Sequence, residues 1–101
     1  MLFVTYWELN EGMSQKEKID VAMRLAALHD DSTRKSVRWD ITPDNWGVSI
    51  FEAETAADVI GLFDMWRAAA PGFFKLTKTA PAMTVEESME LGAANLKMLG
   101  G

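Results

Sequence analysis

The 101-residue chain lacks cysteine and has a single histidine, His29. Without thiols it can form no disulfide, no thiolate metal site and no cysteine nucleophile. With one imidazole it also lacks a metal site built on two histidines. Acidic pairs at 30–31 and 86–87 lie at helix ends, where carboxylates usually cap the helix or face solvent. We therefore expect no bound metal and no dependence on an oxidising compartment.

Long apolar runs and an excess of basic residues are also missing. No hydrophobic stretch approaches the roughly 18 residues of a transmembrane helix, and the N-terminus lacks the basic-then-apolar pattern of a signal peptide. Ten basic residues stand against fifteen acidic ones, which gives a net charge of −5. A nucleic-acid-binding surface normally needs a basic face. We expect a cytoplasmic protein without a membrane or nucleic-acid partner.

The composition that remains is that of one globular domain. Hydrophobic residues make up 49% of the chain and charged residues 25%, and the length fits a single domain spanning 1–101. The predicted elements are a strand at 1–8, a helix after the capping sequence 14–17, strands around 37–41 and 46–53, a helix after 55–58, a strand at 73–79 and a helix after 84–87.

This order, β-α-β-β-α-β followed by a helix, predicts an α+β fold of the ferredoxin-like type. Right-handed crossovers place both long helices on the same face of a four-stranded antiparallel sheet. The turn between the two central strands is predicted at 43–45, where proline, aspartate and asparagine favour tight backbone conformations.

Strand alternation divides the sheet residues into two sets, one mainly aliphatic and one that mixes aromatic rings with charged and hydroxyl side chains. The set predicted to face the helices is mainly aliphatic and contains Leu2, Val4, Tyr6, Val37, Trp39, Ile41, Val48, Ile50, Phe74 and Leu76. The other set is predicted to form a dimer interface and contains Phe3, Trp7, Arg38, Asp40, Phe51 and Phe73. Its aromatic rings would form too large an apolar patch for a monomer in water. The alternative is that the C-terminal helix folds back over this face, with its inner side formed by Val85, Met89, Gly92 or Ala93, and Leu96.

The sequence segments 1–8, 46–53 and 81–90 resemble small bacterial proteins of the dimeric α/β-barrel superfamily. The resemblance is a pattern of elements over nearly the whole chain, without a catalytic signature. It implies a homodimer whose sheets pack face to face, with a pocket between sheet and helices in each subunit. The superfamily includes cofactor-independent monooxygenases, isomerases and haem-degrading enzymes, and the fold alone does not choose among these activities.

Several bulky side chains are candidates for the wall of such a pocket. The predicted ligand-binding residues are Tyr6, Met23, Trp39, Phe63 and Trp66. Rings and adaptable methionines suit a flat or elongated apolar ligand such as a fatty acid or a quinone. The alternative is that these side chains only pack the core.

Tyr6 and His29 are the candidate catalytic residues. A tyrosine hydroxyl can donate a hydrogen bond to a ligand, and histidine has an ordinary pKa near neutrality. His29 also follows the first predicted helix, where a cation would simply suit the helix dipole. Because haem-degrading relatives need a suitably placed histidine, a haem site would have to use His29, but we expect no cofactor.

The sequence thus favours a homodimeric protein that binds an apolar or aromatic small molecule. A cofactor-independent monooxygenase or isomerase is the alternative function, and it requires a polar group of Tyr6, His29 or Asp40 in the pocket. A third hypothesis is an interaction module without a ligand, which a pocket filled by its own side chains would favour.

Overall fold

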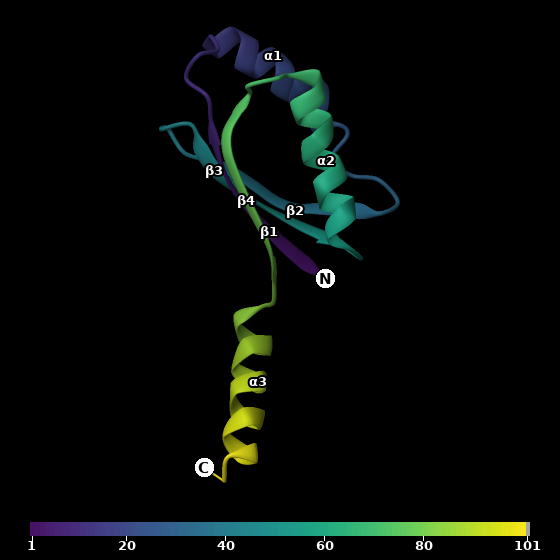
Figure 1. Ribbon diagram of the computed structural model, residues 1–101, viewed down its shortest axis with the longest axis vertical. Helices are drawn as coiled ribbons and strands as arrows, with labels where there is room; N and C mark the ends of the chain where they lie inside the picture. The colour runs from purple at the N-terminus through teal and green to yellow at the C-terminus, as the bar shows by residue number, and fades with distance from the viewer. Residues whose placement is uncertain (101) are drawn as a thin grey trace.

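A computed structural model describes residues 1–100 of the protein (Figure 1). The elements in chain order are β1 (Leu2–Leu9), α1 (Gln15–Ala26), β2 (Arg34–Ile41), β3 (Trp46–Ala53), α2 (Ala56–Ala69), β4 (Phe74–Ala82) and α3 (Val85–Met98). The four strands form an antiparallel sheet in the order β2-β3-β1-β4. The predicted element order and the ferredoxin-like α+β fold are confirmed.

Local sequence signals determine where several elements begin and end. The Ser14 side chain accepts a hydrogen bond from the Glu17 backbone N–H at the start of α1, and Thr84 makes the equivalent bond with Glu87 at the start of α3. The β2–β3 turn contains Asn45 at φ 60°, a left-handed conformation that asparagine tolerates well. These predicted caps and the predicted turn are confirmed.

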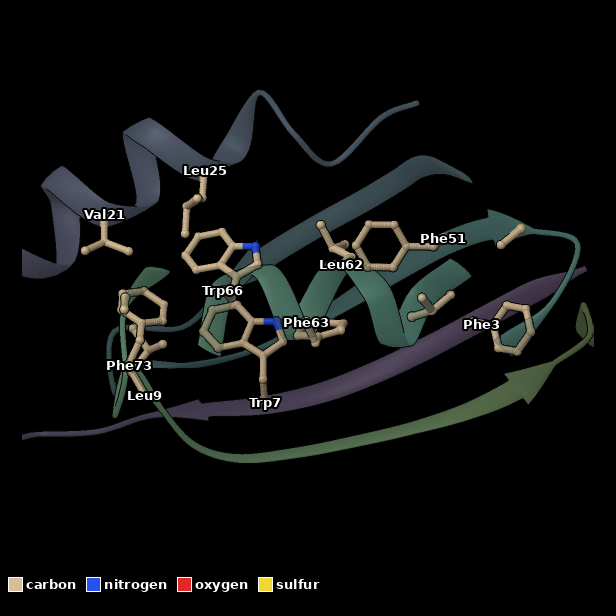
Figure 2. Close-up of a cluster of buried hydrophobic side chains, with 13 residues drawn as sticks. Phe3, Trp7, Leu9, Val21, Leu25, Phe51, Leu62, Phe63, Trp66 and Phe73 are labelled. Carbon is tan, nitrogen blue, oxygen red and sulfur yellow. The ribbon is translucent and has the colours of Figure 1, made fainter. Parts of the chain in front are cut away.

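Helices α1 and α2 cover one face of the sheet, and the core lies between them and the strands (Figures 1 and 2). The buried side chains of β1 are those at positions 3, 5, 7 and 9, which alternate with half-buried ones. They meet Phe51 from β3, Phe63 and Trp66 from α2, and Phe73, which precedes β4.

The predicted faces of β1 and β3 are therefore wrong. Phe3, Trp7, Phe51 and Phe73 are buried under the helices of their own protomer, so they are not free to form a dimer interface. The aliphatic residues of β1 and β3 face the other way. Alternation identifies two sets but not which of them faces the helices, and here the large rings fill the space between the layers. We call the uncovered side, which carries Leu2, Val4, Tyr6, Val48 and Ile50, the open face of the sheet.

Two irregularities change the alternation in the outer strands. The β2–β3 register shifts between Ser36 and Arg38, and the β1–β4 register shifts between Glu8 and Leu9. A bulge adds one residue to a strand and so exchanges the faces beyond it. Trp39 consequently faces the helices, as predicted.

Arg38 and Asp40 lie opposite Ile50 and Val48 in the β2–β3 ladder and so share the open face with them. Both side chains are exposed, and Arg38 Nε lies 2.6 Å from Asp40 Oδ2. The pair forms within one strand of one protomer. Their place at a dimer interface stays a prediction.

Helix α3 extends away from the sheet, and none of its residues is buried (Figure 1). The described chain consequently measures 58 × 31 × 17 Å, with a radius of gyration of 16.7 Å. A compact domain of this length has a radius of about 13 Å. The predicted inner side of α3 packs against no core, and the alternative in which α3 covers the aromatic face is wrong because α1 and α2 cover it.

Candidate functional site

A cavity of about 590 Å³ opens between α1, α2 and the sheet. Its volume falls within the usual range of small-molecule sites, about 300–1,000 Å³. Aromatic side chains form much of its wall: Trp7, Trp39, Trp66, Phe73 and Phe74. Figure 2 shows Trp66 from α2 and Trp7 from β1 on facing sides of the core, with Phe73 beside them.

One face of helix α1 forms another wall of the cavity. Its lining residues are Gln15, Lys18, Ile19, Ala22 and Ala26, with His29 just beyond the helix; apart from the adjacent pair 18–19, they recur at intervals of three or four. This spacing places them in a single stripe along the helix. The two alanines leave space at the centre of the stripe that longer side chains would occupy.

The imidazole of His29 sits within the aromatic cluster. It stacks on Trp39, with ring centroids 3.7 Å apart and planes 10° from parallel, and its Nε2 accepts a hydrogen bond of 3.1 Å from Trp66 Nε1. An indole nitrogen can only donate, so Nε2 must be unprotonated and the neutral ring carries its proton on Nδ1.

Burial lowers the pKa of His29 to about 4. The nearby Asp30 carboxylate acts in the opposite direction, and the Arg34 guanidinium adds to the lowering. His29 is therefore neutral at pH 7 and can offer an N–H from Nδ1. Its basic nitrogen is occupied by Trp66, which makes it a poor general base in this arrangement.

Arg34 holds the His29 segment in place. Its guanidinium donates to the backbone carbonyl oxygens of His29 and Leu28 at 3.2 and 3.0 Å, and to that of Asp58 in α2 at 3.2 Å. It also forms an ion pair with Asp31 at 3.2 Å. One buried side chain thus joins β2, the end of α1 and the start of α2.

Three of the predicted site residues line the cavity, namely Trp39, Trp66 and the catalytic candidate His29. Whether they bind a ligand stays a prediction. Phe63 is buried beside the cavity, packed against Phe74 with ring centroids 5.6 Å apart, but does not line it.

Met23 and Tyr6 lie elsewhere, so the prediction that they line the site is wrong. Met23 is 75% exposed because it is one residue, or about 100° of helix rotation, away from the lining residue Ala22. Tyr6 is on the open face of the sheet, with its ring 5.8 Å from that of Trp46. Local desolvation and the adjacent Glu8 raise the pKa of its hydroxyl.

Sequence reasoning did not identify Lys18 as a site residue, because it lies in a charged segment of α1. It also missed Trp7 and Phe73 as cavity residues, because both were assigned to the other face of the sheet. Stepping back from His29 in intervals of three and four residues would have identified Ala26, Ala22 and Lys18.

Within residues 1–100, no group of three or more His, Asp or Glu side chains is arranged to hold a metal ion. No helix in this part of the chain is long and apolar enough to cross a bilayer.

The chain matches no family model and no curated protein sequence. Among solved structures it is similar to 5-chloro-2-hydroxyhydroquinone dehydrochlorinase (TftG) from Burkholderia phenoliruptrix AC1100, in complex with 2,5-dihydroxybenzoquinone. The TM-score is 0.54 at 21% identity, covering 86% of this chain and 98% of TftG. Protein Atu4242 from Agrobacterium tumefaciens gives a TM-score of 0.49 at 14% identity, covering 81% and 94%. The likeness to TftG shows that the two chains share a fold.

Proposed function

We propose that this protein binds a small aromatic molecule in the cavity beneath α1 and α2. The observation that carries the proposal is a cavity of about 590 Å³ walled by tryptophan and phenylalanine rings and left open by Ala22 and Ala26. Flat rings offer stacking surfaces to a planar ligand. TftG, which has the same fold, is in complex with a hydroxyquinone, and this supports a quinone-like ligand over a fatty acid.

Two observations favour binding over the alternatives. Of Tyr6, His29 and Asp40, which the enzymatic hypothesis requires in the pocket, only His29 lines it, and the basic nitrogen of His29 is occupied. A purely structural module would have this space filled by its own side chains, whereas the cavity is open.

The proposal is tested by calorimetric titration with 2,5-dihydroxybenzoquinone and with naphthalene derivatives. In the variant Ala22→Phe, the new ring occupies the centre of the cavity, so we expect affinity to fall at least tenfold. The matched control is Met23→Phe, which places the same ring on the exposed side of α1 and should leave affinity unchanged. Circular dichroism establishes that both variants are folded. Equal affinity in all three proteins, or no binding of any probe, would contradict the proposal.

We further propose that the protein is a homodimer that pairs through the open face and α3. The described residues expose 6955 Å², whereas a compact monomer of 11.2 kDa exposes about 5,700 Å². The excess, roughly 1,300 Å², exceeds the roughly 800 Å² that each partner buries in a standard interface. Apolar side chains of α3 contribute to this surface, among them Val85, Met89 and Leu96.

A second copy is the partner that these surfaces fit, because an isologous dimer covers two open faces at once. Light scattering should give twice the chain mass of 11.2 kDa at micromolar concentration. Met89→Glu, which puts a charge in the apolar stripe of α3, should shift the mass toward the monomer. The exposed-surface control Glu90→Gln should not. A monomeric wild type would contradict the dimer and leave the cavity proposal standing.

A further inference from the structure

We infer that the ligand of this cavity is an aromatic anion whose negative charge pairs with Lys18. The inference rests on the proposed function, which supplies the aromatic body of the ligand. It adds the charge of the ligand and the residue that recognises it.

Lys18 is a cation in the wall of an otherwise mostly apolar cavity, and its side chain is largely buried. Only 7% of its surface is exposed, whereas the other lysines in the chain are exposed. Lysine is rarely buried to this extent unless it is paired with an anion. The helical stripe that contains Ala22 and His29 directs this residue to the cavity.

No partner for the Lys18 ammonium is found among the described residues. The ion pairs of residues 1–100 involve Arg34, Arg38 and Arg67, and no side-chain hydrogen bond involves Lys18. Asp30 is the one carboxylate that lines the cavity. It accepts a hydrogen bond of 2.6 Å from the Ser36 backbone N–H and makes no ion pair with Lys18.

Arg34 shows how this protein treats a buried cation that serves the fold. It is 9% exposed, similar to Lys18, yet it makes three hydrogen bonds to carbonyl oxygens and one ion pair. Lys18 has none of these. The only fully buried side-chain polar atom without a partner among the described residues is Thr42 Oγ1, so the Lys18 ammonium is accessible and free to pair with an anionic group of a ligand.

Lys18 and His29, two of the polar residues that line the cavity, are separated along α1. Lys18 and Ala26 are eight residues apart, or about 12 Å along the helix axis, and His29 follows Ala26. Between these ends lie the small side chain of Ala22 and the aromatic wall. This arrangement suits a planar ligand with an anionic group at the Lys18 end and an acceptor oxygen at the other end, where His29 Nδ1 can donate.

The test compares three probes of the same shape and different charge: 2-naphthoate, 2-naphthamide and 2-naphthylmethylammonium. Each is titrated into the full chain by calorimetry at pH 7. We expect 2-naphthoate to bind at least tenfold more tightly than the amide, the scale of a hydrogen bond to a charged group. The ammonium probe should bind most weakly.

Four variants separate charge from shape. Lys18→Met keeps an unbranched side chain without the charge and should bind 2-naphthoate and 2-naphthamide equally. Lys18→Gln serves the same purpose if the methionine variant does not fold. Lys18→Arg keeps the charge and should retain the preference for the anion. Lys16→Met removes an exposed charge from the same helix and should leave all affinities unchanged.

Thermal unfolding provides a second readout. Because Lys18 has no protein partner, Lys18→Met should leave the midpoint of the ligand-free protein unchanged or higher. A fall of several degrees would mean that Lys18 is part of a structural ion pair, and it would overturn the inference.

The outcomes distinguish the two proposals. If wild type binds the acid and the amide equally, the ligand charge is wrong and the cavity still binds aromatic molecules. If Lys18→Met weakens both probes to the same degree, Lys18 acts through shape and the inference is again overturned. If none of the three probes binds, the aromatic-binding function itself fails.

Discussion

The single histidine makes the stability of this protein depend on pH in a way that can be assigned to one residue. His29 has a pKa of about 4 in the folded chain and an ordinary value of 6.5 when exposed. Between these values the unfolded chain binds a proton that the folded chain does not, so unfolding is favoured as the pH falls. The contribution of His29 is therefore fully present above pH 6.5 and is lost as the pH falls toward 4.

The size of the effect follows from the two pKa values. Linkage gives a loss of about 1.4 kcal/mol in the free energy of unfolding between pH 7.5 and 5.5, and about 2 kcal/mol by pH 5.0. The full difference of about 3 kcal/mol requires pH values below 4. Asp31, whose pKa is lowered mainly by hydrogen bonds from Thr33, titrates below this window and does not obscure it.

Urea denaturation at fixed protein concentration measures this loss at pH 7.5, 6.5, 5.5 and 5.0. The chain has no other histidine, so the variant His29→Gln removes imidazole titration entirely and should flatten the profile. Proton NMR of the wild type gives one imidazole C2–H resonance, which should titrate well below pH 6. A resonance that titrates near 6.5, or a His29→Gln profile as steep as that of the wild type, would refute the buried neutral imidazole.

Three further predictions concern the packing around the site. Gly47→Ala should destabilise the protein by about 1–3 kcal/mol or more in urea denaturation, because the added Cβ would overlap the Asp40 carbonyl oxygen and the adjacent indole ring. The matched control Gly61→Ala, in open space on α2, should instead stabilise the protein by up to about 1 kcal/mol. Equal effects of the two substitutions would contradict the close approach of Gly47 to its neighbours. Trp66→Ala should lower the free energy of unfolding by about 3–5 kcal/mol, since the ring is 2% exposed. Trp66→Phe removes the indole N–H that donates to His29 Nε2 and should raise the pKa of His29 measured by NMR. An unchanged pKa would contradict that hydrogen bond. Arg34→Met should lower the thermal midpoint far more than Arg24→Met on the exposed side of α1, because it leaves three carbonyl oxygens without their donor.

The parts of the fold that could be predicted from the sequence depend on local chemistry. The caps at Ser14 and Thr84 and the turn before Trp46 involve residues within a few positions of one another, so their hydrogen bonds could be read from the spacing. The order of strands and helices then determined the ferredoxin-like topology, because few connections are compatible with right-handed crossovers.

The faces of the sheet depend on contacts that the local sequence does not contain. Phe3 and Leu2 are both apolar, and only the depth of the space beneath the helices decides which of them is covered. The shift in register at Ser36–Arg38 adds a second difficulty, because a bulge leaves no clear sequence signal and reverses every later orientation in the strand. Trp39 faced the helices as predicted, but by way of a bulge and not by uninterrupted alternation.

The dependence on contacts outside the local sequence also explains why Lys18 was not identified as a site residue. Lys18 lies beside Lys16 and Glu17 in a charged segment, and by composition it belongs to the outer surface of α1. Its place in the wall follows from its position in line with Ala22 and His29, which line the same cavity. A charged residue that contradicts its local pattern in this way needs a reason, because departures from the pattern are expected at functional sites. A negatively charged ligand supplies that reason for Lys18, and no other described group in the cavity does.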